Sequence, residues 1–164
     1  MFGVLQQFWG RLQLVRRLAI ALAVGLLWTN PPAFASSLLS DFAALKQLAA
    51  ESVTYSVAMA DSKPALVEFY AEWCATCRSM APAIARLHEE YGDRVNFVML
   101  DIDDPQWALQ IRKFGVMGVP HYAFVGSRQD EAGDRALVST AIGYQPTVIM
   151  ATGLDRLLTS DVNL

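Results

Sequence analysis

Apolar and polar positions follow two distinct periods from about residue 36 onward. Short apolar runs rich in β-branched and aromatic residues are typical of buried strands, whereas apolar residues that recur at three and four positions are typical of amphipathic helices. An amphipathic helix is predicted over residues 36–50, and residues 53–60 suit either a short helix or a strand. The pattern then predicts, in order, strand 65–71, helix 74–91, strand 95–102, helix 105–114, strand 120–125, strand 136–142 and helix 145–158.

Turn and capping residues separate these elements. Residues 61–64 read as a turn, Gly92 ends the longest helix, and residues 126–134 form a polar turn region. Pro82 lies inside the longest helix, where proline is expected to produce a kink. Strands that alternate with helices, followed by a hairpin and a closing helix, predict a single α/β domain with a mixed central sheet covered by helices on both faces.

A different pattern occupies the N-terminal residues. Arg11, Arg16 and Arg17 form a basic segment without acidic residues, and residues 18–28 are an uninterrupted apolar run. Residues 33–35 read Ala-Phe-Ala, which resembles the site that signal peptidase cuts, so a secretory signal is predicted. The apolar run is shorter than the roughly 20 residues that cross a bilayer comfortably, but an uncleaved anchor is the alternative. The adjacent arginines disfavour a buried helix of the mature domain.

These patterns predict three parts, which are residues 1–35 as signal peptide or N-terminal apolar anchor helix, residues 36–52 as an amphipathic helical spacer, and residues 53–160 as the folded domain. In either membrane interpretation the basic end stays in the cytoplasm. The domain is therefore expected outside the cytoplasm, tethered if residues 12–35 stay uncleaved. Whether the spacer packs on the domain or separates it from the membrane is left open.

Net charge and histidine content restrict the partners and cofactors that this chain is expected to bind. The formal net charge is −3 with both signs scattered, and the absence of a basic stripe argues against a nucleic-acid partner. The only histidines are His88 and His121, which are too far apart for the paired-histidine spacing of a zinc site. Neither a metal nor another cofactor is predicted.

The two cysteines, Cys74 and Cys77, stand two residues apart between a predicted strand and a predicted helix. A structural disulfide over so short a loop removes little unfolded-state entropy, and a metal site lacks further ligands, so both alternatives are disfavoured. A redox-active pair fits better, because unpaired N–H groups and the helix dipole stabilise a thiolate at the first helical turn. Cys74 is predicted as the nucleophile and Cys77 as the resolving thiol.

Residues 67–82 contain Trp73-Cys74-Ala75-Thr76-Cys77 and a proline five residues after the second cysteine, and residues 116–120 end in Pro120. These landmarks resemble the active-site segment and the cis-proline loop of the thioredoxin family, and the resemblance covers residues 53–158. More narrowly, the chain resembles the membrane-anchored thioredoxin-like proteins of cyanobacteria and chloroplasts, whose domain faces the thylakoid lumen or periplasm. That narrower match is carried by residues 68–71, 96–100, 120–121 and 142–146.

The resemblance implies roles for individual residues. Glu68 matches the buried acid that relays a proton for Cys77, so its pKa is expected to be raised, the alternative being a solvated glutamate at a strand edge. Met99 stands where many relatives have a lysine, which strengthens that expectation. Pro120 is expected to follow a cis peptide bond. His121 is expected to be structural.

A small apolar docking surface for substrates is also implied. It comprises Trp73, Val119, Ile142 and Gly143, with plain core packing as the equal alternative for Ile142. The backbone of Val119 is expected to pair with an extended substrate segment.

The resemblance implies a thiol–disulfide oxidoreductase. Ala75 and Thr76 carry no charge that would stabilise the Cys74 thiolate, so a reducing potential and a protein-disulfide reductase are predicted. The family further implies a transmembrane thiol carrier as electron donor and apocytochrome c as one recipient, in support of cytochrome c and b6f maturation. The alternatives are a disulfide oxidase or isomerase, and a non-catalytic binding or chaperone module with the same fold.

Overall fold

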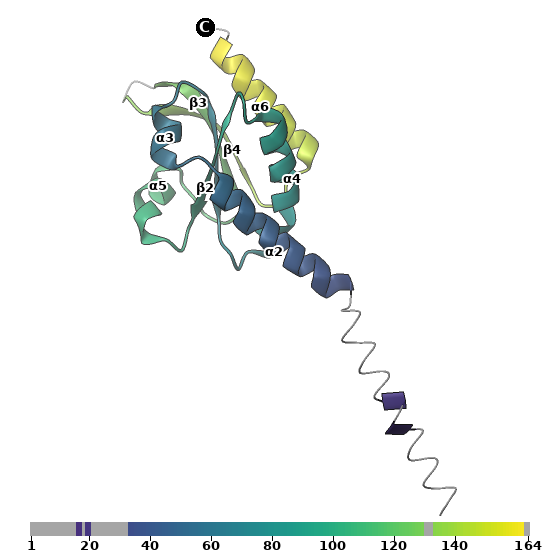
Figure 1. Cartoon of the computed structure of the whole chain (residues 1–164). Coiled ribbons are helices and arrows are strands. Elements are labelled where there is room, and N and C mark those ends of the chain that lie inside the picture. The colour runs from purple at the N-terminus through teal and green to yellow at the C-terminus, as the bar shows by residue number, and fades with distance from the viewer. Residues whose placement is uncertain (1–15, 18, 21–32, 130–132, 163–164) are drawn as a thin grey trace, which may run out of the picture. The chain divides into compact units, whose positions relative to one another are not determined.

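The computed structural model describes residues 16–17, 19–20, 33–129 and 133–162 (Figure 1). The predicted signal or anchor therefore lies largely outside the described residues. Among the residues that are described, no helix combines the length and the apolar character needed to cross a bilayer. The compact unit that begins at Ser40 contains the whole sheet.

Four strands form one mixed sheet in the order β2-β1-β3-β4. The two central strands are β1 (Ala65–Tyr70) and β3 (His121–Gln129), and the two edge strands are β2 (Asn96–Asp101) and β4 (Arg135–Ile142). β1 runs parallel to β2 and antiparallel to β3, and β3 runs antiparallel to β4. Five of the six residues of β1 are buried, which explains why this central strand is almost continuously apolar.

Helices cover both faces of the sheet, as predicted (Figure 1). On one face, α4 (Ala75–Tyr91) and α6 (Thr147–Val162) pack on the side chains of Leu66, Phe97 and Phe124. On the other face, α3 (Tyr55–Ala60) and α5 (Ala108–Lys113) pack on Val67 and Phe69. The alternation of side chains along β1 thus divides the core into two apolar layers.

The structure decides the two cases that the pattern left open. Residues 55–60 form a helix, preceded by Val53, whose N–H donates to the carbonyl of Phe97 at 2.9 Å. The helix α2 (Ala33–Glu51) places Leu45 and Leu48 in the same core layer as α4, so its second half packs on the domain.

Two predicted boundaries are wrong. The helix over 105–114 is divided into a 3-10 turn, η1 (Pro105–Trp107), and α5, because Asp104 caps the turn through the N–H of Gln106. The predicted polar turn over 126–134 begins too early, since β3 continues to Gln129. Arg135 donates to the carbonyls of Gly126 and Lys63 and so ties the hairpin to the start of β1.

Candidate active site

Cys74 is the N-cap residue of α4, directly after the loop that leaves β1. Its φ of −72° and ψ of 108° are extended, and its Sγ atom accepts the N–H of Cys77 at 3.1 Å. The two cysteines form a disulfide with their Cα atoms 5.3 Å apart. Only Cys74 reaches the surface, with 7% of its area exposed against 0% for Cys77. The arrangement presents one sulfur to a partner and buries the other.

The N-terminus of α4 also favours a thiolate on Cys74 after reduction. Backbone N–H groups at a helix start lack intrahelical acceptors, and the N–H of Cys77 is already directed at the Cys74 sulfur. Together with the helix dipole, such donors lower the pKa of a thiol.

The peptide bond between Val119 and Pro120 is cis, as expected. The carbonyl oxygen of Val119 lies 3.6 Å from the Sγ atom of Cys74. The carbonyl of Pro120 accepts the N–H of Gly143 at 2.8 Å, and Gly143 has a φ of 76° that favours glycine. The start of β3 and the end of β4 therefore meet beside the dithiol.

Glu68 is buried in the middle of β1, with only 2% of its area exposed. Its register partners are Met99 on β2 and Tyr122 on β3. Glu68 therefore lies in a central strand, and the alternative of a solvated glutamate at a strand edge is wrong. Burial raises the pKa of Glu68 from 4.5 to about 8, and the nearby Tyr122 hydroxyl lowers it by less. Neither carboxyl oxygen has hydrogen-bond geometry with any described group. Glu68 is thus suited to hold a proton at neutral pH.

Glu68 and Cys77 belong to the same side of the sheet. Leu66, two residues before Glu68 on β1, packs in the layer that contains Cys77 and Met80 of α4. Because alternate strand residues share a face, Glu68 points into this layer. The acid and the buried sulfur therefore share one apolar compartment.

Several apolar side chains on the segments that meet at the dithiol are exposed. Trp73 is exposed beside Cys74, and Ile142 has 51% of its area exposed, which argues against plain core packing for Ile142. Val119 is partly buried against both core layers. The sequence did not reveal that Met117 and Tyr144, next to the two loops, are also largely exposed. Their only signal was proximity to the cis-proline and to Gly143.

A further residue missed by the sequence analysis is Asp103, whose Oδ2 atom accepts the indole N–H of Trp73 at 2.8 Å. Asp103 follows β2 after one intervening residue, and no local signal showed this contact, because it depends on the parallel pairing that brings the carboxyl ends of β1 and β2 to one edge. Two more contacts hold the same loop. Lys46 of α2 pairs with Glu72 at 3.1 Å, and Arg78 donates to the Glu72 carbonyl at 2.6 Å.

His121, next to Pro120, lies on the opposite face of the sheet from Glu68. It is 2% exposed and packs edge-on against the ring of Phe69, with centroids 5.9 Å apart and an interplanar angle of 87°. Within the described part of the chain, neither ring nitrogen has a hydrogen-bond partner. Burial lowers the pKa of His121, so it is a neutral core residue at pH 7.

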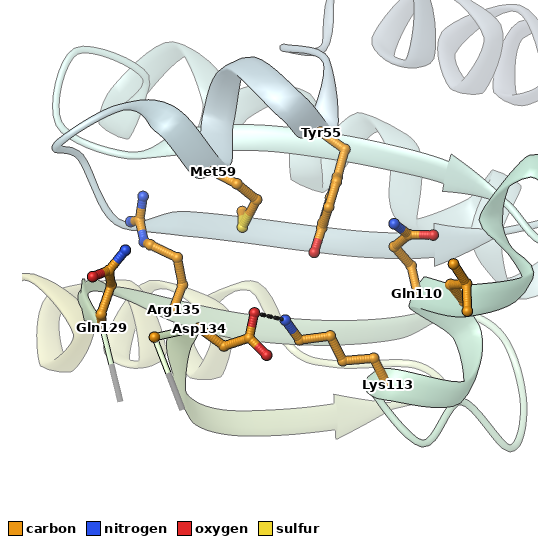
Figure 2. A pocket seen from close by; sticks show the side chains of 9 residues that line it. Tyr55, Met59, Gln110, Lys113, Gln129, Asp134 and Arg135 are labelled. Atoms are coloured by element: carbon orange, nitrogen blue, oxygen red, sulfur yellow. Dashed lines mark ion pairs between the residues drawn. The ribbon is translucent and has the colours of Figure 1, made fainter. Parts of the chain in front are cut away.

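A separate hollow of about 440 Å³ lies beside α3 and α5 (Figure 2). Tyr55 points toward the ion pair of Lys113 and Asp134, whose charged atoms lie 2.6 Å apart. Gln129 and Arg135 line this hollow from the strands. They pair at the far end of β3 from His121, which pairs with the last residues of β1 beside the dithiol. The hollow therefore lies at the opposite end of the sheet from the dithiol. This hollow is no part of the candidate active site.

Comparison with known proteins agrees with this geometry. The thioredoxin family model matches residues 45–141, which is more than half of the chain. Thioredoxin-like protein HCF164, chloroplastic, of Oryza sativa subsp. japonica is 42% identical over 123 residues, covering 74% of this chain and 45% of that protein. Thiol:disulfide interchange protein TxlA of Synechococcus elongatus is 37% identical over 116 residues, covering 71% and 58%.

The chain spans about half the length of these curated relatives. Among solved structures, oxidised mitochondrial thioredoxin 3 from Saccharomyces cerevisiae superposes with a TM-score of 0.53 at 20% identity, covering 67% of this chain and 99% of that one. At that identity the likeness concerns the fold. The relatives confirm the narrower resemblance to chloroplast and cyanobacterial thioredoxin-like proteins, and the chain belongs to the thioredoxin family.

Proposed function

We propose that this protein reduces protein disulfides through Cys74 and Cys77. The observation that carries the proposal is the pairing of a surface sulfur at the start of α4 with a buried sulfur one turn later. The first is placed to attack a substrate, and the second is placed to release it.

The reaction transfers two electrons in two exchanges. The Cys74 thiolate attacks one sulfur of the substrate disulfide, forming a mixed disulfide and releasing the other substrate sulfur as a thiolate that takes a proton. Cys77 then attacks the Cys74 sulfur, and the remaining substrate thiol leaves. The products are two substrate thiols and the Cys74–Cys77 disulfide.

Glu68 is proposed to take the proton that Cys77 loses before its attack. With a pKa of about 8, Glu68 is mostly protonated at pH 7, and its smaller ionised fraction is the form that accepts this proton. Trp73, Val119, Ile142 and Gly143 are proposed to contact the substrate, and Pro120 keeps a backbone N–H away from the sulfurs because proline has none.

The direction of electron flow is proposed to be reducing. Ala75 and Thr76, between the cysteines, carry no charge that would stabilise the Cys74 thiolate. The reduced form therefore gains no extra stability, and the reduction potential of the pair stays low. A dithiol donor must then regenerate Cys74 and Cys77. By likeness to the chloroplast and cyanobacterial relatives, we infer an extracytoplasmic site of action, a transmembrane thiol carrier as donor, and apocytochrome c as one recipient.

Reduction of insulin disulfides and the reduction potential of the Cys74–Cys77 pair test this function together. We expect turnover by the wild type, none by Cys74→Ser, and a potential nearer to about −270 mV than to about −120 mV. A potential near the latter value favours the oxidase or isomerase alternative. Equal inactivity of both proteins favours the binding-module alternative.

A further inference from the structure

A hollow of about 260 Å³ lies between the edge strand β4 and α6. Its residues come from both elements and from β3 beneath them, and those used below are Phe124, Ser139, Ala141, Ile149, Met150 and Gly153. Phe124 and Met150 are buried and provide an apolar floor, whereas Ile149 forms a wall with 54% of its area exposed. The hollow is therefore open to solvent and mostly apolar where a side chain would enter.

Beside the hollow, α6 approaches the sheet closely at a residue without a side chain. A Cβ atom on Gly153 would lie 2.7 Å from the Cε1 atom of Phe124. On the strand side of the hollow, β4 contributes the small side chains of Ser139 and Ala141. Among the described residues that line the hollow, Arg156 is the one charged side chain.

The strand beside the hollow is at the edge of the sheet, so its outer backbone groups face away from β3. Pairing of β4 with β3 is regular only from Ser139 to Ile142, because the register shifts between Phe124 and Val125. A short regular edge suits a short extended segment. It is poorly suited to the long edge-to-edge pairing that would join two copies of this chain.

This edge leads directly to the dithiol. β4 ends at Ile142, and the next residue, Gly143, donates to the carbonyl of Pro120 at 2.8 Å. The adjacent carbonyl, that of Val119, lies 3.6 Å from the Cys74 sulfur. At about 3.3 Å per residue, a strand laid along Ser139 to Ile142 is within roughly four to six residues of Cys74.

We propose that the β4 edge and the hollow bind an extended segment of the protein whose disulfide Cys74 reduces. Backbone groups of the segment pair with β4, and one large aliphatic side chain, four to six residues from the reacting cysteine, enters the hollow. This subsite rests on the proposed function and adds a substrate class to it, namely disulfides followed or preceded at that distance by an aliphatic residue.

Disulfide-bridged peptides test the subsite. One set carries leucine at the fourth, fifth or sixth residue on either side of the cystine loop, and a matched set carries serine there. We expect the best leucine peptide to have a kcat/KM about tenfold above its serine counterpart, mainly through KM, as burial of one aliphatic side chain predicts.

Two variants on the same turn of α6 provide the matched control. Ile149→Glu places a charge at the wall of the hollow and is expected to remove the leucine preference. Val148→Glu, at a residue that is 68% exposed and does not line the hollow, is expected to keep it. Ser139→Phe, which fills the hollow from the strand, gives the same loss as Ile149→Glu and serves if that variant does not fold. Hydroxyethyl disulfide, which is too small to reach the hollow, is reduced equally by all folded variants.

The outcomes separate this inference from the proposed function. Equal rates for leucine and serine peptides with the wild type, or equal loss of preference in Ile149→Glu and Val148→Glu, overturn the subsite. Sedimentation that shows a wild-type dimer, dissociated by Ile149→Glu, also overturns it, because the edge then binds a second copy. Failure of the wild type to reduce hydroxyethyl disulfide overturns the proposed reductase itself.

Discussion

The indole N–H of Trp73 donates to the Oδ2 atom of Asp103 at 2.8 Å, and this bond joins the loop after β1 to the loop after β2. The backbone of Asp103 is itself held, since its N–H donates to Asp101 at 3.0 Å. Trp73 is exposed, so burial does not fix the position of its ring. The hydrogen bond therefore orients an apolar side chain beside Cys74, and Asp103 acts as a positioning residue.

Asp103→Ala is expected to release the Trp73 ring and to raise KM for protein disulfides. A hydrogen bond to a charged group contributes about 1.5–3 kcal/mol when sheltered and less at the surface, so a loss of about 3- to 10-fold in kcat/KM is expected. Asp103→Asn, which keeps an acceptor, should retain most of the activity. The Trp73 indole resonance in NMR should move in Asp103→Ala. An unchanged resonance contradicts the positioning role.

Glu68 is expected to make folding stability fall as pH rises from about 4.5 to about 8. In this interval the unfolded chain has an ionised Glu68, whereas the folded chain keeps it protonated, so unfolding releases a proton and higher pH favours it. The loss over the interval is of the order of 5 kcal/mol at 1.36 kcal/mol per pKa unit. Urea unfolding at several pH values, compared with Glu68→Gln, measures it. Parallel pH profiles for the two proteins contradict the raised pKa.

His121 has the opposite effect on the acid side. Its folded pKa lies below the ordinary value of 6.5, so the unfolded chain binds a proton first as pH falls. Stability from this residue is thus present above pH 6.5 and is lost as pH falls toward the lowered folded pKa. His121→Leu, which keeps the apolar contact with Phe69, should lose less stability between pH 6.5 and 5 than the wild type in thermal unfolding. A steeper loss in the variant than in the wild type would contradict the lowered pKa of His121.

Gly153→Ala is expected to destabilise the fold, because the added Cβ would lie 2.7 Å from Phe124 and forces α6 or the ring to move. Overpacking of this kind typically costs about 1–3 kcal/mol. Gly118→Ala is the matched control, since a Cβ there meets no atom within 4 Å and its φ is not positive. Denaturant unfolding should separate the two variants. Similar midpoints would indicate that Phe124 shifts into the neighbouring hollow without cost.

The features that local sequence determines were predictable. The spacing of Cys74 and Cys77, the helix that follows them and the apolar strand containing Glu68 each depend on residues close together in the chain. The cis bond at Pro120 was expected from a resemblance, and its place beside Cys74 follows from the pairing of β3 with β1.

The features that depend on where separate strands end were not predictable. Asp103 meets Trp73 only because β1 and β2 are parallel and in register to their last residues. At this end of β3, Arg135 donates to the carbonyls of Gly126 and Lys63, and the second of these lies far away in the sequence. Polar residues there read as a turn, since no local pattern shows the contact between Arg135 and Lys63.

Trapping of the mixed disulfide tests the central claim most directly, namely that Cys74 attacks and Cys77 resolves. Reduced Cys77→Ser and Cys74→Ser are each mixed with a disulfide-bridged peptide, and the products are mapped by mass spectrometry under non-reducing conditions. The account predicts that Cys77→Ser accumulates a covalent complex through Cys74, whereas Cys74→Ser forms little, because Cys77 has no exposed surface. A complex that forms faster through Cys77 than through Cys74 would contradict it.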